Sequence, residues 1–197
     1  MKDIDVREAV HKKVLKDHHK NPDTLIIDEF NISLGSARAD ITVINGILHG
    51  YELKSSKDTL ERLPGQITHY SSIMDKATLV VAENHMDEAI NLLPDWWGVK
   101  IVIQGNRGGI NFLSHRADKF NPIVNELALA QLLWKEECLC VLDRMGLAKG
   151  NRSKPRFELW QILAECTPLR MLKLEVRMAL KNRIAWRDQG RAGKCAE

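Results

Sequence analysis

Five polar residues in one stretch of the chain have the types and the spacing of a hydrolytic site. Asp40 lies in one short apolar run, Glu52 and Lys54 lie in the next run as Glu-Leu-Lys, and Gln66 and Tyr70 follow after a charged connector. Alternate residues of a strand point to the same face, so Glu52 and Lys54 are expected to project together. An antiparallel partner strand would bring the carboxylate of Asp40 beside that of Glu52.

This set of side chains predicts metal-assisted chemistry on a phosphate. Asp40, Glu52 and the backbone carbonyl of Leu53 form a ligand set for a hard cation such as Mg²⁺, with Mn²⁺ as a substitute. Lys54 would then orient a water or stabilise negative charge on the phosphate. Gln66 and Tyr70 are four residues apart, so on a helix they share one face and can reach the same cleft.

Two further acids are candidates for completing the site. Glu8 lies in a predicted first helix, and Glu29 lies in a predicted strand with the sequence LIIDEFNI. Either acid would add a catalytic carboxylate or a metal ligand. The alternative for each is an ordinary acid on the surface, which the sequence leaves open.

The elements that must position these residues can be read from hydrophobic periodicity. Val6, Val10 and Val14 form a helical stripe, and the dipeptide Asn45-Gly46 is a hairpin signal between two strands. The pattern predicts helices over 6–20, 64–75 and 87–93, strands over 25–32, 38–44, 47–55, 77–82 and 99–104, and an irregular segment over 105–122. The first three strands are expected to form an antiparallel meander.

The remaining third of the chain reads as helical. Helices are predicted over 123–145, 157–165 and 168–187, which divides the chain into a core over 1–122 and a helical basic region over 123–197. In the last helix an apolar stripe is expected to dock on the body of the protein, on a second copy in a homodimer, or on another protein partner. That stripe consists of Leu169, Leu172, Val176 and Leu180.

Charge is distributed unevenly along the chain. Residues 144–197 contain 13 Lys and Arg against five Asp and Glu, a net charge of +8, whereas the other 143 residues carry −5. A basic tail on an acidic body favours contact with a polyanion, although a solvated basic face would have the same composition. Apolar runs are shorter than the roughly 18 residues that span a bilayer, so we expect a cytoplasmic protein with no membrane contact.

The ordered set of motifs resembles the PD-(D/E)XK nuclease superfamily, and the Gln66–Tyr70 pair resembles its RecB-like branch of small standalone bacterial and phage nucleases. The resemblance covers about residues 5–104, and Ala39 stands where many members have proline before the first Asp. It implies an α/β, restriction-endonuclease-like αβββαβ core with a mixed sheet, followed here by the all-helical C-terminal region. It also implies that Asp40 and Glu52 bind metal, that Lys54 is catalytic, and that Gln66, Tyr70 and Glu8 assist.

The residue types and spacing and the superfamily resemblance predict the same function. This function is Mg²⁺-dependent hydrolysis of phosphodiester bonds in nucleic acid, and the expected nucleic acid is DNA. The alternative is a catalytically inactive module that keeps the fold and binds nucleic acid or a protein partner. A third possibility is a pure interaction protein whose helical tail docks on another subunit.

Overall fold

The computed structural model describes residues 2–105 and 108–189, with side chains described up to Arg183. The chain divides into two compact units, Met1–Val124 and Asn125–Glu197. The sequence-based boundary at residue 122 lies two positions before this division.

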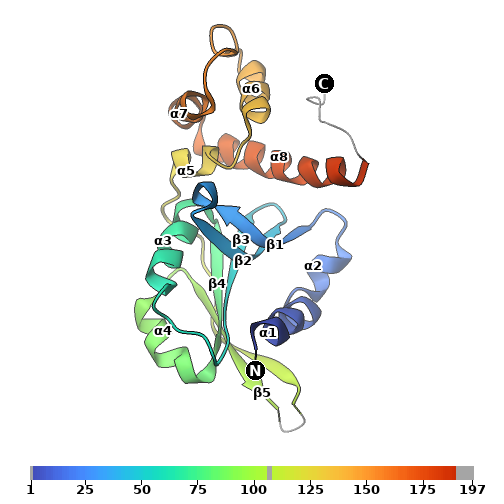
Figure 1. The fold of residues 1–197 in the computed structure, drawn as a ribbon, viewed down its shortest axis with the longest axis vertical. Helices are drawn as coiled ribbons and strands as arrows, with labels where there is room; N and C mark the ends of the chain where they lie inside the picture. Colours follow the sequence, from blue (N-terminus) through green and yellow to red (C-terminus); the bar gives the residue numbers. More distant parts are fainter. Residues whose placement is uncertain (1, 106–107, 190–197) are drawn as a thin grey trace. The chain divides into compact units, whose positions relative to one another are not determined.

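The N-terminal unit is built on a six-stranded mixed sheet in the order β1-β2-β3-β4-β5-β6 (Figure 1). β1, β2 and β3 form an antiparallel meander, β4 and β5 add in parallel, and β6 is antiparallel to β5. The mixed α/β class and the meander expected from the sequence are confirmed. The strands span Leu25–Ile32 (β1), Ala37–Ile44 (β2), Leu48–Lys54 (β3), Lys76–Ala82 (β4), Gly98–Gln104 (β5) and Ile110–Arg116 (β6).

The first helical segment differs from the single regular helix that the sequence predicted. It consists of α1 (Asp3–Ala9), a π-helical turn η1 (Val10–Val14) and α2 (Lys16–Lys20). The wider π turn buries Leu15 fully in the core beside Val6 and Val10, and Val14 packs against this core while only partly buried. Val6, Val10 and Leu15 are fully buried against apolar residues of the sheet, including Tyr51 and Leu53 of β3.

The opposite face of the sheet is covered by α3 (Leu63–Ile73) and α4 (Met86–Leu92) (Figure 1). Pro64 at the first turn of α3 is compatible with a helix start, because proline lacks an N–H that the first turn leaves unbonded. Because Leu53 turns toward α1, its neighbours Glu52 and Lys54 turn toward α3. The sheet therefore separates an apolar core on one face from a polar cluster on the other.

One strand was missed by the sequence reading. Residues 105–122 were expected to be irregular, yet Ile110–Arg116 forms β6, paired from Ile110 opposite Gln104 to Arg116 opposite Val99. This edge strand has no buried residue. The apolar alternation that identifies a half-buried strand is therefore weak in its sequence.

The C-terminal unit contains α5 (Glu126–Ala130), α6 (Lys135–Arg144), α7 (Arg156–Cys166) and α8 (Leu169–Gln189). The single helix expected over 123–145 is wrong, because residues 131–134 leave the helix between α5 and α6. Leu132 and Leu133 of this turn are buried, and the indole N–H of Trp160 donates to the carbonyl of Leu133 over 3.0 Å.

The apolar stripe predicted for the last helix is confirmed in its central part. Leu172, Val176 and Leu180 are buried, and α8 packs against α5 and α7. Leu174 and Met178, off this stripe, remain exposed. Residues 190–197 of the basic tail lie outside the described residues. Within the described part of the chain, no helix has both the length and the apolar character needed to cross a membrane.

Candidate active site

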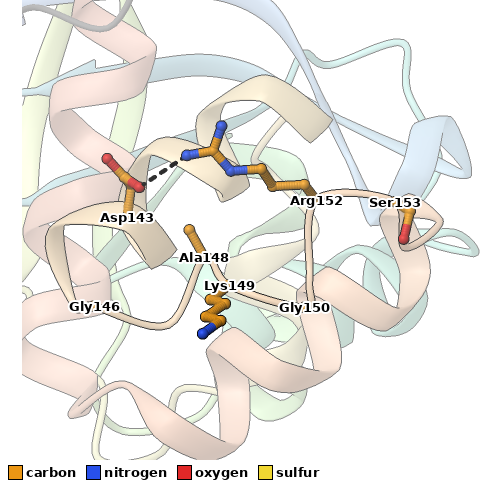
Figure 2. Close-up of a pocket in the computed structure, with 7 residues that line it drawn as sticks. All are labelled: Asp143, Gly146, Ala148, Lys149, Gly150, Arg152 and Ser153. Carbon is orange, nitrogen blue, oxygen red and sulfur yellow. Dashed lines mark hydrogen bonds and ion pairs between the residues drawn. The ribbon is translucent and has the colours of Figure 1, made fainter.

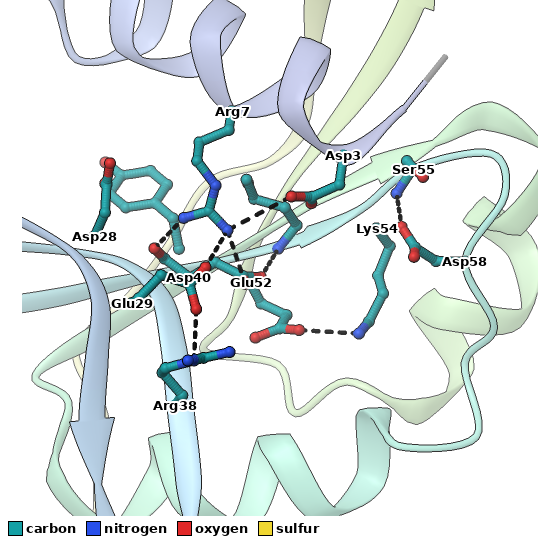
Figure 3. A network of polar contacts seen from close by, with 12 residues as sticks. Asp3, Arg7, Asp28, Glu29, Arg38, Asp40, Glu52, Lys54, Ser55 and Asp58 are labelled. Carbon is teal, nitrogen blue, oxygen red and sulfur yellow. Dashed lines mark hydrogen bonds and ion pairs between the residues drawn. The ribbon is translucent and has the colours of Figure 1, made fainter.

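A polar cavity of about 710 Å³ opens beside the ends of β2 and β3 and the start of α3. Its lining carries six acids and four bases, so it is a site for charged groups rather than for an apolar ligand. The charged lining residues are Asp3, Arg7, Glu29, Arg38, Asp40, Glu52, Lys54, Asp58, Glu61 and Arg62. Figure 3 shows most of these side chains.

Asp40 lies where β2 and β3 separate. The ladder between these strands ends with Ile41 opposite Tyr51, one residue beyond Asp40. The Asp40 carboxylate takes up the main-chain donor that the ladder leaves free, because its Oδ2 accepts from the Leu53 N–H over 2.8 Å. The separation of the strands thus turns the Asp40 side chain across β3 toward Glu52.

Glu52, Lys54 and Gln66 form a closed polar triangle. The Lys54 ammonium lies 2.9 Å from Oε1 of Glu52 and donates to Oε1 of Gln66 over 2.8 Å. The Gln66 amide in turn donates to Oε1 of Glu52 over 2.5 Å. Glu52 and Lys54 are 1% and 4% exposed. An ammonium has three donors, so Lys54 keeps one for a group in the cavity.

Tyr70 joins the triangle from the next turn of α3. Its hydroxyl lies 2.8 Å from Oε2 of Glu52 and 3.1 Å from the carbonyl of Tyr51, and it accepts from the Asp40 N–H over 3.2 Å. The ring is fully buried and packs against Trp97, with centroids 5.2 Å apart. Trp96 and Trp97 are both buried.

Burial sets the protonation of the carboxyls. Burial, followed by repulsion from Asp40, raises the pKa of Glu52 to about 7, and Lys54 only partly opposes this shift. Burial also raises the pKa of Asp40, against the hydrogen bond from the Leu53 N–H and the attraction of Arg7. Burial likewise raises the pKa of the Tyr70 phenol, which stays protonated as a donor. The two carboxylates are therefore incompletely compensated by the surrounding residues.

The residues present fit a hydrated hard cation. Within the part of the chain that the structure describes, no three His, Cys, Asp or Glu side chains converge to hold a metal ion by themselves. Mg²⁺ does not need such a group, since it is usually held by one or two carboxylates with waters and substrate phosphates. A cation near Asp40 and Glu52 would offset the burial that raises the pKa values of both groups and the repulsion that Asp40 exerts on Glu52.

The structure brings together Asp40, Glu52, Lys54, Gln66 and Tyr70, and it places Leu53 and Glu29 at the same cavity. Glu29 is held there by Arg7 and Arg38. Glu8 does not lie among the residues that line the cavity. Its side chain is 61% exposed and pairs with Lys12, four residues along the helix. We therefore withdraw Glu8 as the acid that completes the site.

Arg7 is the residue at the site that sequence reasoning missed. Its side chain is 11% exposed, and its guanidinium contacts Asp40, Glu29 and Asp3 (Figure 3). The signal in the sequence was its position next to Val6 on the buried side of the helix. A charged side chain there needs acidic partners, and Asp40 is 33 residues away in sequence.

A second cavity, of about 610 Å³, lies in the C-terminal unit along the loop after α6. Its charged side chains do not converge: Arg152 reaches back to Asp143 over 3.4 Å, and Lys149 points away from both (Figure 2). The polar cavity of the N-terminal unit is therefore the stronger candidate for chemistry.

Comparison with known proteins places the chain in a phage family. Residues 3–190 match the family described as bacteriophage P4 protein cII. The chain belongs to this family. It is 28% identical over 161 residues to protein cII of Enterobacteria phage P4, an alignment that covers 82% of this chain and 60% of that relative. The chain thus spans less than two thirds of the length of the cII protein it matches. No solved structure matches the chain.

Proposed function

We propose that the N-terminal unit is a metal-dependent nuclease of the PD-(D/E)XK type that hydrolyses phosphodiester bonds in DNA. The observation that carries this proposal is the convergence of Asp40 from β2, Glu52 and Lys54 from β3, and Gln66 from α3 on one cavity, with the buried Tyr70 of α3 bonded to Glu52. The order of the elements also supports it, since helix, meander, helix and parallel strand follow one another as in that superfamily's core.

Asp40, Glu52 and the Leu53 carbonyl are the groups that would hold Mg²⁺. The bound ion would polarise a phosphate oxygen and lower the pKa of a water. Lys54 is positioned by Glu52 and Gln66 so that its remaining donor can bind the water or a phosphate oxygen. Tyr70 and Gln66 each donate to a different oxygen of Glu52, which fixes the orientation of that carboxylate.

The test is cleavage of labelled single- and double-stranded DNA by the full chain with Mg²⁺ or Mn²⁺. We expect Asp40→Asn and Lys54→Met each to lower the cleavage rate by at least 100-fold, because each removes a group that acts on the reacting phosphate. Glu8→Gln is the matched control, since Glu8 is an exposed acid away from the cavity, and it should cleave at the wild-type rate.

Two outcomes would contradict the proposal. Cleavage that survives both Asp40→Asn and Lys54→Met would come from another source. A wild-type protein that binds DNA but leaves it intact with either metal would instead be the inactive binding module.

A further inference from the structure

We propose that Arg7 is a positioning residue for Asp40, and that Glu29 anchors Arg7 in that role. This inference rests on the proposed function, because it concerns how the cation site is held in shape. Figure 3 shows the guanidinium reaching from α1 to the carboxylates on β1 and β2.

The guanidinium binds the backbone and the side chain of the same residue. Nη1 of Arg7 donates to the carbonyl oxygen of Asp40 over 2.5 Å, and Nη2 donates to Oδ1 of Asp40 over 3.2 Å. The other carboxylate oxygen, Oδ2, accepts from the Leu53 N–H. Each oxygen of Asp40 therefore has one fixed donor, which stops the carboxylate from rotating and leaves its other lone pairs for a ligand.

Glu29 holds Arg7 from the opposite side. Its Oε1 lies 2.6 Å from Nη2 of Arg7, and its Oε2 lies 2.5 Å from Nε of Arg38. Nη1 and Nη2 of Arg7 are thus engaged by Asp40 and Glu29. Arg7 therefore acts on the site through its contact with Asp40.

The backbone of Glu29 is strained at this point. Its φ is +55°, a left-handed value that costs free energy for any residue with a side chain. The β1–β2 ladder pairs Asp28 with Ile41 and Phe30 with Ala39, and it omits the position between them, where Glu29 faces Asp40. A strained residue that breaks the ladder opposite a predicted metal ligand, and that binds the arginine touching that ligand, indicates a functional constraint.

The positioning of Asp40 depends on the planar guanidinium fork of arginine, that is, on its two parallel N–H donors. Two parallel N–H donors can reach a carbonyl and a carboxylate oxygen together, whereas a lysine ammonium is a point charge on a flexible chain. Arg7→Lys keeps the positive charge beside the cation site and removes the fork. It therefore separates the geometric role of Arg7 from its charge.

The experiment measures Mn²⁺ binding to the full chain by titration calorimetry, a readout that does not depend on cleavage. Asp40→Asn defines how much of the binding belongs to this site. We expect Arg7→Lys to raise the Kd of that site about tenfold, as is usual when the partner of a metal ligand is lost. Arg62→Lys, at an exposed arginine of the same cavity, is the control and should change the Kd less than about twofold.

Glu29→Gly provides a second variant that does not rely on Arg7. Glycine accepts a positive φ without strain, so the folded protein should be at least as resistant to heat as wild type. The same variant should bind Mn²⁺ more weakly, because Arg7 has lost its anchor. Unchanged or higher stability together with weaker metal binding in both Glu29→Gly and Arg7→Lys is a combination that a merely structural ion pair would not produce. Weaker binding in Glu29→Gly alone would make Glu29 itself a ligand and would overturn the positioning role.

The outcomes separate this inference from the proposed function. If the wild type shows an Asp40-dependent Mn²⁺ site and cuts DNA, but Arg7→Lys and Glu29→Gly bind Mn²⁺ as tightly as wild type, the positioning role is wrong and the nuclease stands. If the wild type and Asp40→Asn bind Mn²⁺ equally and neither cuts DNA, both proposals fall.

Discussion

The hydroxyl of Tyr70 lies 2.8 Å from Oε2 of Glu52, and the Tyr70 ring closes over Gly50, two residues earlier on the same strand. A Cβ atom at Gly50 would lie 2.7 Å from the ring. This close approach of α3 to β3 is what lets a helical residue reach a carboxylate on the sheet. The geometry of the site therefore depends on the absence of a side chain at position 50.

Gly50→Ala should destabilise the protein and displace Tyr70. The ring is fully buried, so it cannot swing aside, and overpacking of this kind costs about 1–3 kcal/mol of unfolding free energy. Chemical denaturation measures the loss. Gly65→Ala is the control, because a Cβ there meets nothing within 4 Å in helix α3, and it should leave stability unchanged or raise it by up to about 1 kcal/mol. Equal effects of the two substitutions would contradict the packing described here.

Tyr70→Phe should cost about 1–2 kcal/mol of unfolding free energy. The change removes a donor from the buried Oε2 of Glu52 and an acceptor from the Asp40 N–H. The hydrogen bond from Tyr70 lowers the pKa of Glu52, so its loss should raise that pKa further. Carbon-detected NMR titration of the Glu52 carboxyl checks the shift. A pKa that falls in Tyr70→Phe would refute the role assigned to the hydroxyl.

The contribution of Glu52 to the stability of the metal-free protein should fall as pH rises from about 4.5 to 7. Burial of His49, which lowers its pKa from 6.5 to about 4, acts in the opposite sense over this range, so the Glu52 contribution is read as a difference between wild type and Glu52→Gln. The folded state raises the pKa of Glu52 from 4.5 to about 7, so it binds that proton more tightly than the unfolded chain does. The contribution is present below the unfolded pKa and is lost as the pH rises through the folded one, by up to about 3 kcal/mol. Denaturant midpoints measured across this window test the sign.

Glu52→Gln is the control for that pH profile, because glutamine resembles the protonated acid and does not titrate. Its stability relative to wild type should rise between pH 4.5 and 7, and it should exceed that of wild type at pH 8 without metal. Since a cation binds the charged carboxylate, added Mn²⁺ should stabilise the wild type more at pH 8 than at pH 6. A stability difference between wild type and Glu52→Gln that stays constant across the window would contradict the burial of a charged Glu52.

In the C-terminal unit, Arg183→Met should be far more costly than Arg152→Met. Arg183 pairs with the buried Glu137 and donates to the Leu132 carbonyl over 2.6 Å, and the side chains of the pair are only 14% and 8% exposed. Leaving a buried carboxylate without its partner costs about 3–5 kcal/mol. The pair of Arg152 with Asp143 is 78% and 67% exposed, so its loss should be close to neutral. Thermal and denaturant unfolding of both variants measures the contrast.

Much of the N-terminal unit could be predicted because local patterns agree with its topology. β1 to β5 lie within a residue or two of their expected bounds, and the turn at Asn45-Gly46 has the positive φ that glycine supplies. The edge strand β6 was not predicted, because its side chains are largely exposed and show no clear apolar alternation. It forms because the fold supplies β5 as a pairing partner. Its existence depends on the backbone of β5 rather than on its own pattern.

The candidate site could be predicted where its residues are close in sequence. Glu52 and Lys54 share a strand face, and Gln66 and Tyr70 share a helix face, so spacing alone groups them. The contact of Arg7 with Asp40 spans 33 residues and depends on the helix packing across the sheet. The positive φ of Glu29 has no local signature, because glutamate seldom adopts it.

The π turn at Val10–Val14 has a consequence for insertions and deletions in this family. Val6 and Val10 are four residues apart, whereas Val10 and the next buried residue, Leu15, are five apart. Removing one residue between positions 11 and 14 would return Leu15 to ordinary α-helical spacing and would leave Arg7 in place. The first helix therefore carries what amounts to a one-residue insertion, and relatives that lack that residue can keep both the apolar contact and the arginine.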